Sequence, residues 1–309
     1  MTLVSVLVAA YKPTYLESAL KSALAQTHRE IEVVVVDDSA GSAVAEIVER
    51  LGDTRVRYLR NETNRGPAIS HARAIAEASG PVLGVLNDDD VWEPNLAARL
   101  LEALEASPEA AVAFADHWVM VDGSRDDAAS DECSRRWKRD TLAPGLHRPF
   151  RGLAVLDKTI PLAVSALFRR AAVEGRVIPA EIGGTYDLFL LSLLCRSGAG
   201  AVYVPERLAS WRGHEENLSI DVSCARAEEA AAVLRILVAD RELAELRPAL
   251  RAVYGSALSS VASRNLAGGS RRRAASAALA AVRQGHMESA RLLPRSLLPR
   301  RLASRLRPA

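Results

Sequence analysis

The sequence contains few cysteines, and they follow no pairing pattern. Cys133, Cys195 and Cys224 are the only three, they lie far apart, and none belongs to a CxxC motif. An odd and scattered set of thiols argues against both a disulfide framework and a zinc knuckle. We therefore expect a protein of a reducing compartment, the cytoplasm.

Long apolar runs are also missing. The N-terminal stretch "MTLVSVLVAAYKP" (1–13) lacks a basic leader region, and its apolar run is far shorter than the roughly 20 residues that span a bilayer. This stretch predicts a buried first strand. The composition, 49% hydrophobic and 25% charged over 309 residues, excludes disordered and collagen-like classes and allows one or two domains.

The segment after that first strand, "AAYKPTYLES" (9–18), has no glycine. A NAD-binding dehydrogenase needs GxGxxG at this place, so that class is excluded. The same absence argues against a sugar nucleotidyltransferase, which opens with a Gly-rich, basic phosphate loop.

Negative charge is nearly absent from the C-terminal end. From Arg264 onward there are eleven Arg and one acid, Glu288, a net charge of +10; since the whole chain is +2, residues 1–263 carry −8. The segment 290–309 spaces Leu among Arg and three Pro. Two interpretations stay open, a peripheral contact with an anionic membrane surface and a solvated basic tail. Nucleic-acid binding is not expected, because the tail lacks interleaved aromatic residues.

Short β-branched runs alternate with stretches of helical periodicity in the first half of the chain. The strands are expected at 3–10, 31–36, 55–59, 81–86 and 110–121, and the helices at 14–27, 42–51, 66–79 and 94–107. This alternation predicts an α/β fold, a mostly parallel sheet with helices on its faces.

The remaining segments are less regular. Residues 122–145 are polar and rich in turn formers, and a connection this long predicts a functional lid or a disordered loop. A strand is expected at 160–170, a helix at 185–198 and a strand pair broken at Pro205 over 201–214. Beyond about Asp221 the pattern is helical and rich in Ala and Arg. We therefore expect two domains, 1–220 and a helical extension, 221–309.

Polar residues follow each of the first four strands. They are Tyr11 and Lys12, Asp37 and Asp38, Asn64 to Gly66, and Asp88 to Asp90. Because ligands bind beyond the carboxyl ends of the strands in such sheets, these groups are expected to converge on one edge.

The triplet Asp88, Asp89 and Asp90 raises an electrostatic problem, since like charges this close repel one another. On an extended backbone Asp88 and Asp90 would point to one side and Asp89 to the other. Two carboxylates on one side suit a hard divalent cation, Mg²⁺ or Mn²⁺. The alternative is that Asp89 and Asp90 cap the helix that starts near Pro94.

The pair Asp37 and Asp38 repeats this arrangement after four Val. One carboxylate there is suited to accept hydrogen bonds from a base or a ribose, and the other to cap the helix from Ser42.

Four segments together carry a resemblance. "SVLVAAYKP" (5–13), "EVVVVDDSAG" (32–41), "NRGPAISHARAIAEASG" (64–80) and "VLNDDDVWEP" (85–94), in this order and at these spacings, resemble family 2 glycosyltransferases of the GT-A fold. The resemblance covers residues 1–220. It implies a GT-A (Rossmann-like) fold and a metal-dependent, inverting transfer of a sugar from a nucleoside diphosphate.

Carried across by position, the resemblance implies contacts with the donor. It places Ala9, Tyr11 and Asp38 around the base and ribose, and Asn64 and Gly66 in the loop beside them. His71 stands where the family often has an Arg that approaches the nucleotide. Arg73 is an alternative for that task, and a structural role for Arg73 is equally open.

Asp88 to Asp90 correspond to the family's DxD region, in which one acid contacts the ribose or sugar and another holds the metal. Asp88 and Asp89 are assigned to the donor, and Asp90 with Asp88 to the metal. Asn87 stands where the family often has Asp, so the assignment of each acid shifts by up to one residue.

A general base must take the proton of the acceptor hydroxyl. "GGTYDLFLLSLL" (183–194) resembles the family segment that supplies it, and Asp187 is its carboxylate. The family often has an acid two places earlier, at Thr185 here, so a helix cap at Asp187 is the alternative, with Glu181 as a more distant base. In "WRGHEENLS" (211–219), His214 resembles a histidine that completes the metal or diphosphate site.

The sequence therefore predicts a glycosyltransferase that uses a nucleotide-diphosphate sugar as donor and Mg²⁺ or Mn²⁺ as cofactor. The expected acceptor is a hydroxyl on a glycan, a lipid-linked glycan or a small molecule, in cell-surface glycan or secondary-metabolite biosynthesis. A sugar nucleotidyltransferase and an inactive sugar-nucleotide-binding or scaffold protein are the alternatives. The expected location is the cytoplasm, with peripheral contact at the inner face of the plasma membrane.

Overall fold

The structure, a computed structural model, describes residues 1–196, 198–213 and 223–293. The chain divides into two compact units, Met1–Asn217 and Leu218–Ala309. The boundary expected at residue 220 falls within 214–222, outside the described residues, and stays a prediction.

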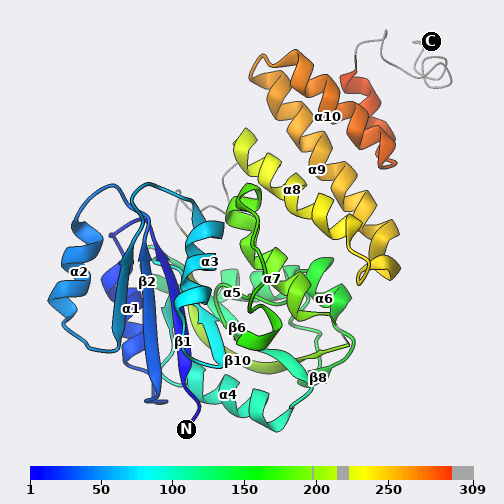
Figure 1. Ribbon diagram of the computed structural model, residues 1–309. Coiled ribbons are helices and arrows are strands. Elements are labelled where there is room, and N and C mark those ends of the chain that lie inside the picture. The colour runs from blue at the N-terminus through cyan, green and yellow to red at the C-terminus, as the bar shows by residue number, and fades with distance from the viewer. Residues whose placement is uncertain (197, 214–222, 294–309) are drawn as a thin grey trace. The chain divides into compact units, whose positions relative to one another are not determined.

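The first unit is built on one mixed sheet (Figure 1). The strand order is β3-β2-β1-β4-β9-β6-β10-β5, with β7 paired to β6 and β8 paired to β10. The strands are β1 (Val4–Ala10), β2 (Ile31–Asp37), β3 (Val56–Arg60), β4 (Val82–Val85), β5 (Val91–Trp92), β6 (Ala110–Val121), β7 (Ser124–Asp126), β8 (Gly145–His147), β9 (Ala166–Arg169) and β10 (Gly200–Arg212).

Strand direction decides where the loops gather. β1 runs parallel to β2 and β4, and β2 runs parallel to β3. β9 is antiparallel to both β4 and β6, and β10 is parallel to β6. The two reversals restore the original direction, so β1, β2, β3, β4, β6 and β10 end at the same edge. The expected α/β class is confirmed. Its sheet is mixed because β9 is inserted and because β5, β7 and β8 also pair antiparallel with their neighbours.

Helices cover the sheet and form the second unit. In the first unit they are α1 (Leu16–Leu24), α2 (Ala43–Leu51), α3 (Pro67–Glu77), α4 (Leu96–Ala106), α5 (Asp127–Arg136), α6 (Arg151–Val155) and α7 (Tyr186–Leu194), with the 3-10 helices η1 (Arg170–Ala172) and η2 (Ala180–Thr185). In the second unit they are α8 (Cys224–Ala239), η4 (Ala244–Leu246), α9 (Arg247–Ala267), α10 (Arg271–Arg283) and η5 (Met287–Leu292).

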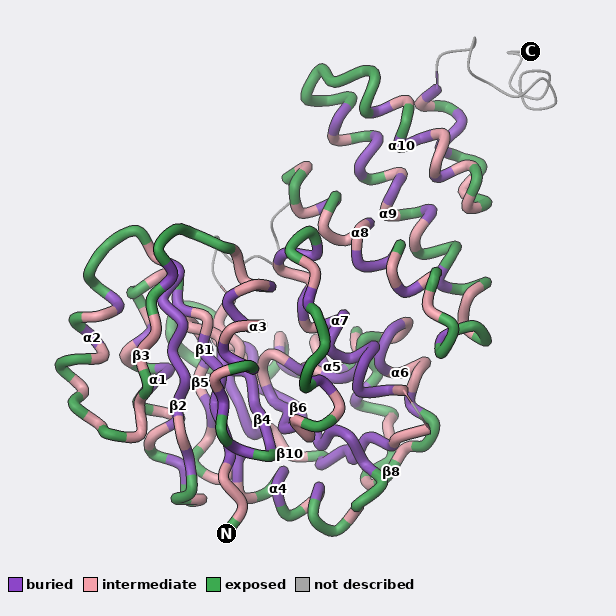
Figure 2. Tube along the Cα trace, in the orientation of Figure 1, coloured by how far each residue is buried: buried purple, intermediate pink, exposed green. Residues whose placement is uncertain are grey.

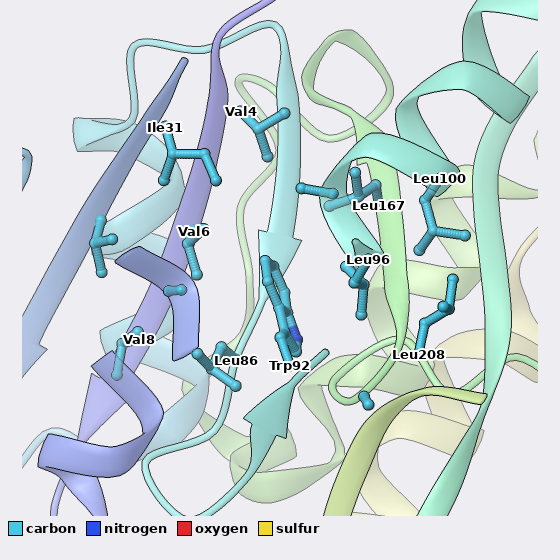
Figure 3. Packing of buried hydrophobic residues seen from close by; sticks show 14 of the residues in the cluster. Val4, Val6, Val8, Ile31, Leu86, Trp92, Leu96, Leu100, Leu167 and Leu208 are labelled. Atoms are coloured by element: carbon cyan, nitrogen blue, oxygen red, sulfur yellow. The ribbon is translucent and has the colours of Figure 1, made fainter. Parts of the chain in front are cut away.

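The core of the first unit follows from strand alternation. Val4, Val6 and Val8 of β1 join one cluster with the apolar faces of α1, α2 and α4 (Figure 3). The intervening Leu7 is also buried, and it points to the opposite face, where α3 packs. Figure 2 shows buried positions along the strands of the sheet. Burial on both faces explains why β1 and β2 are almost entirely apolar.

Trp92 fixes the short strand β5 to this core. Its side chain is 2% exposed, and its indole Nε1 donates a hydrogen bond to Val164 O at 3.0 Å. The ring lies over β4 at Gly84, where an added Cβ would be only 2.7 Å from Trp92 Cη2. The absence of a side chain at Gly84 therefore makes room for the indole.

The described part of the second unit contains helices only. α8, α9 and α10 pack around small side chains, among them Ala262, Ala278 and Ala281, which are fully buried. Small residues let helix backbones approach closely, which explains the high Ala content of this segment. Within the described residues, every helix is too short or too polar to cross a bilayer.

The prediction of a long loop at 122–145 is wrong for the first part of this segment, because β7 and α5 form there. Asp126 caps α5 by accepting a hydrogen bond from Ala129 N at 2.9 Å. The buried residues of α5 are Ser130 and Ser134, whose hydroxyls bond to Asp126 O and to the Asp116 carboxylate. A helix whose buried face is polar has no hydrophobic periodicity to detect.

The strand pair expected around Pro205 is instead the single strand β10. Its pairing with β6 has a register irregularity between Val204 and Arg207. Proline lacks an N–H for the ladder, and the irregularity accommodates it without ending the strand.

Candidate active site

The acidic triplet lies on a turn. β4 ends at Val85, and Asp90 N donates a hydrogen bond to Asn87 O at 3.3 Å, with Asp88 and Asp89 at the two central positions. The expected alternation of side chains along an extended backbone is therefore wrong. Asn and Asp favour such turns, so the composition of this segment ends the strand earlier than its charge pattern suggests.

Asp88 joins the ends of β1 and β4. Its Oδ2 accepts hydrogen bonds from the backbone amides of Tyr11 and Lys12, both at 2.8 Å. Burial, with a smaller contribution from the Asp89 carboxylate, raises the pKa of Asp88 to about 6. β1 continues to β2 on one side and pairs with β4 on the other, so this contact marks the switch point of the parallel strands, where α/β proteins bind ligands.

Asp90 is the most deeply buried acid of the turn, with 0% exposure. Its Oδ1 accepts a hydrogen bond from Arg212 N at 2.9 Å, and its Oδ2 accepts one from Asn87 Nδ2 at 3.0 Å. Burial and the Asp89 carboxylate raise its pKa well above the ordinary value. The helix cap considered as an alternative is not formed, because α4 has Asn95 at its N-cap position.

Arg212 is a residue that the sequence did not single out. It ends β10, donates from Nε to Asp89 O at 3.0 Å, and places its guanidinium 4.2 Å from the Tyr15 ring centroid. It therefore connects the acidic turn with the segment after β1. The position of Arg212 at the end of a strand on the same edge of the sheet could have identified it from the sequence.

Asp38 organises the neighbouring loop. Its carboxylate accepts hydrogen bonds from Asn61 Nδ2, Arg65 N and Gly66 N, each at 2.8 Å. The residue is 4% exposed. The Asn64 side chain accepts a further bond from Gly66 N at 3.0 Å. Gly66 has φ +78°, a left-handed conformation that glycine adopts readily, just before Pro67 starts α3.

Asn61 was also missed, although it follows β3 directly. It is buried, and besides Asp38 it donates to Ser70 Oγ at 3.0 Å and accepts from Arg73 Nη1 at 2.8 Å. Arg73 also donates to Arg60 O at 2.7 Å. These contacts correspond to a structural role for Arg73, the second of the two roles considered for it.

Asp37 has a different task from Asp38. It is fully buried, accepts hydrogen bonds from Ser39 N at 2.9 Å and Tyr58 Oη at 2.6 Å, and thus closes the turn after β2. Neither acid caps α2, whose N-cap Ser42 makes no side-chain cap bond with the helix.

The residues expected around the base lie at this edge. Tyr11 is 54% exposed and Ala9 is partly exposed. His71, expected near the nucleotide, is 2% exposed. Its Nδ1 bonds to Pro67 O at 2.9 Å, and its ring stacks on Tyr186 with centroids 3.9 Å apart. Burial lowers the pKa of His71 to about 4, so the imidazole is neutral at pH 7.

Asp187 lies in the first turn of α7 and is half-buried. Its Oδ1 accepts a hydrogen bond from Leu188 N at 2.7 Å, while Thr185 holds the N-cap position of α7. The preceding Tyr186 donates to Asn87 Oδ1 at 3.1 Å, which ties the start of α7 to the acidic turn.

The field around Tyr186 supports this proximity. Burial raises its pKa well above the ordinary value, and four carboxylates add to the effect: Asp187, Asp90, Asp89 and Asp88. The expected base and the acidic turn therefore both lie near enough to the phenol group to act on its pKa.

The expected metal ligands are only partly within the described residues. His214 lies outside them. Among residues 1–196, 198–213 and 223–293, no three His, Cys, Asp or Glu side chains are grouped so that they could hold a metal ion. The described part thus supplies at most two members of the expected set, Asp88 and Asp90. Their oxygens are the hard donors that Mg²⁺ and Mn²⁺ prefer. Burial raises the pKa of both carboxyl groups, and a bound cation would favour their charged forms.

The switch-point sheet with polar loops and an acidic turn at its carboxyl edge defines an α/β protein of the GT-A class. Residues 5–174, more than half of the chain, match the family model "Glycosyl transferase family 2". The chain belongs to this family of glycosyltransferases, as its sequence resemblance predicted.

Proteins with similar sequences include glycosyltransferases and a polysaccharide biosynthesis protein. An uncharacterized glycosyltransferase of Nostoc sp. is 26% identical over 246 residues, which are 74% of this chain and 70% of that protein. The succinoglycan biosynthesis protein ExoO of Rhizobium meliloti is 37% identical over 105 residues, 34% of this chain and 30% of that protein.

A third relative has a defined reaction in its name. The UDP-Glc:alpha-D-GlcNAc-diphosphoundecaprenol beta-1,3-glucosyltransferase WfaP of Escherichia coli is 34% identical over 94 residues, 30% of this chain and 37% of that protein. The matches to ExoO and WfaP thus span only about a third of each relative.

Solved structures confirm the fold. TarS of S. aureus in complex with UDP-GlcNAc superposes with a TM-score of 0.61 at 15% identity, covering 96% of this chain and 85% of that one. Mannosyltransferase PcManGT of Pyrobaculum calidifontis, in complex with GDP-Man and Mn²⁺, gives 0.59 at 19% identity, with 94% and 85% coverage. At these identities the likeness establishes the fold alone.

Proposed function

We propose that this protein transfers a glycosyl group from a nucleoside-diphosphate sugar to an acceptor hydroxyl, with inversion at the anomeric carbon. The observation that carries the proposal is the contact of Asp88 with the amides of Tyr11 and Lys12. It brings the acidic turn to the end of β1, at the switch point where the loop held by Asp38 also lies. A nucleotide and its diphosphate fit this juxtaposition of polar loops.

The donor base and ribose are assigned to the loops after β1 and β2. Tyr11 presents an exposed ring, and Ala9 contributes its backbone at the end of β1. Asp38 already accepts three hydrogen bonds from the 61–66 loop, so it acts mainly by holding Asn64 and Gly66 in place. A carboxylate has about four acceptor positions, which leaves one for the nucleotide.

Asp90 and Asp88, with His214, are the proposed ligands of Mg²⁺ or Mn²⁺, and Asp88 and Asp89 are the proposed contacts with the ribose or sugar. A bound divalent cation would act as a Lewis acid that stabilises the charge on the departing diphosphate. Each oxygen of Asp90 uses one of its two lone pairs for a protein hydrogen bond, so acceptor capacity remains.

Asp187 is the proposed general base. It would accept the proton of the acceptor hydroxyl as the oxygen forms its bond to the anomeric carbon on the face opposite the leaving group, which gives inversion. Its support is the hydrogen bond from Tyr186 to Asn87, which keeps the start of α7 beside the acidic turn.

The biological setting is proposed from the relatives. ExoO is named for succinoglycan biosynthesis and WfaP for transfer to a diphosphoundecaprenol-linked sugar. We infer that this chain acts on a cell-surface glycan, a lipid-linked glycan or a small-molecule acceptor, at the cytoplasmic side of the membrane, to which the basic C-terminal end adds a peripheral contact.

The test is a donor panel of UDP-, GDP- and TDP-sugars, with release of nucleoside diphosphate as the readout and Mn²⁺, Mg²⁺ or EDTA in parallel. One donor is expected to release its diphosphate in the presence of the cation and not with EDTA. Asp187→Asn should lower this turnover at least about 100-fold, because a general base contributes 10²–10⁴. Glu181→Gln removes the alternative base and should leave turnover unchanged. The anomeric proton of the product, followed by NMR, reports inversion.

Other outcomes point to the alternatives. Release of pyrophosphate from a nucleoside triphosphate and a sugar 1-phosphate, supplied in place of the donor, would indicate a sugar nucleotidyltransferase. Calorimetry that detects no nucleotide binding, or binding without turnover of any donor, would favour a scaffold protein. Full turnover by Asp187→Asn would place the base elsewhere.

A further inference from the structure

Asn87 lies in the turn after β4, and His71 lies in α3. Although they are 16 positions apart and lie on different elements, both contact the same side chain, Tyr186 of α7. Tyr186 therefore links the turn after β4 to α3.

Tyr186 is held on two sides. Its ring stacks on His71 with centroids 3.9 Å apart and an interplanar angle of 16°. His71 is itself fixed to the first turn of α3, because its Nδ1 donates to Pro67 O. With the ring fixed, the phenol hydroxyl reaches Asn87 Oδ1 at 3.1 Å.

Asn87 passes this constraint to the acidic turn. Its Nδ2 donates to Asp90 Oδ2 at 3.0 Å, and Asp90 Oδ1 accepts from Arg212 N at 2.9 Å. Three hydrogen bonds thus connect α7, the turn after β4 and the end of β10 in series. The first two of these segments carry the proposed base and the acidic cluster, and the third ends at Arg212.

An amide suits position 87 for a chemical reason. It accepts from Tyr186 with its oxygen and donates to Asp90 with its nitrogen, without adding charge. An aspartate there would still accept from Tyr186 but would have no donor for Asp90. It would also place a fourth carboxylate beside Asp88, Asp89 and Asp90.

We propose that Asn87 and Tyr186 are positioning residues of the glycosyl transfer, which hold Asp187 in register with the acidic turn. This inference rests on the proposed function. The hydrogen bond from Tyr186 to Asn87 joins the two elements that carry the proposed reacting groups. The packing against His71 needs only the ring of Tyr186. Removing the hydroxyl therefore separates positioning from packing.

The test compares four variants of the full chain in the donor assay: Tyr186→Phe, Asn87→Ala, their combination, and the control Tyr203→Phe. Tyr203 is another buried tyrosine of the same unit, and its ring stacks on Phe114. Tyr186→Phe should lower kcat about tenfold, the effect of one hydrogen bond that holds reacting groups in place. The donor KM should stay within about twofold of wild type, and so should kcat of Tyr203→Phe.

The double variant gives the decisive comparison. If Asn87 and Tyr186 act through one bond, the combination should be no slower than Asn87→Ala alone. A tenfold loss for Tyr186→Phe in both backgrounds would overturn the proposal, and so would a kcat for Tyr186→Phe equal to that of Tyr203→Phe. If Asn87→Ala does not fold, judged by its thermal unfolding, Tyr186→Phe against Tyr203→Phe still decides. A wild-type chain that turns over no donor would refute the proposed function instead.

Discussion

At the scale of single residues, the three consecutive aspartates have different environments. Asp88 is bonded to two backbone amides of the β1 loop, and Asp90 is enclosed and bonded to Asn87 and Arg212. For both, burial outweighs these hydrogen bonds and raises the pKa. The turn therefore stores an electrostatic cost in the folded state, which a bound cation would relieve.

Asp88→Asn tests that cost directly. The pKa of Asp88 is raised from 3.8 to about 6, so the charged carboxylate destabilises the folded state. This destabilisation is absent below pH 3.8, grows as the pH rises to about 6, and is constant above it. A shift of this size corresponds to at most about 3 kcal/mol. In EDTA buffer the variant should therefore have a higher thermal unfolding midpoint than wild type at pH 8 and the same midpoint at pH 4.

Asp53→Asn is the control with the opposite sign. Its hydrogen bonds with Arg55 lower the pKa of Asp53. The charged carboxylate therefore stabilises the folded state at pH values above the ordinary pKa of 3.8. This variant should lower the midpoint at pH 8. If Asp88→Asn lowered the midpoint by the same amount at pH 8 and pH 4, the charge of Asp88 would not be the destabilising feature.

At the scale of elements, β4 connects the core to the site. The strand is only four residues long, and it leads directly into the acidic turn. Gly84 lies within it beneath two buried side chains, Leu167 and Trp92. The packing of β4 and the position of the turn are therefore coupled.

Gly84→Ala should destabilise the first unit by about 1–3 kcal/mol, the usual result of overpacking a dense core. An added Cβ would be 2.6 Å from Leu167 Cδ2 and 2.7 Å from Trp92 Cη2, so neighbours must shift. The measurement is the urea unfolding midpoint. Gly41→Ala is the control, because no atom lies within 4 Å of its added Cβ. An equal effect of the two substitutions would show that the packing over β4 accommodates the methyl group.

At the scale of the whole molecule, the two units differ in composition and charge. The first contains the mixed sheet and the site, and the described part of the second consists of Ala-rich helices. Residues 294–309 add five Arg and no acid. A cluster of this kind is attracted to anionic lipid by about 1 kcal/mol per basic residue near the surface.

Removal of residues 294–309 should therefore weaken binding to vesicles that contain anionic lipid, measured by flotation at low salt. Vesicles of neutral lipid are the control and should bind neither form. Residues 1–293 are retained, so donor turnover on a soluble acceptor should be unchanged. Equal flotation of both forms would remove the membrane contact from the proposal.

Local patterns in the sequence determined much of the fold. The alternation of apolar strands and amphipathic helices gave the α/β class, and the polar residues after each strand identified the edge that Tyr11, Asp38 and Asp88 share. These properties depend on neighbours along the chain, which a sequence displays directly. The helix α5 was not predicted, because its buried residues, Ser130 and Ser134, are polar.

Only the tertiary structure decided the partners of each site residue. Asn87 bonds to Tyr186, 99 positions away, and Asp90 bonds to Arg212, 122 positions away. The roles of Asn61 and His71 are of the same kind, since each depends on which element packs against it. Such contacts are set by strand order and helix packing, and residue spacing along the chain carries no record of them. The sequence by itself determined which groups gather at the site, and the packing determined what each of them holds.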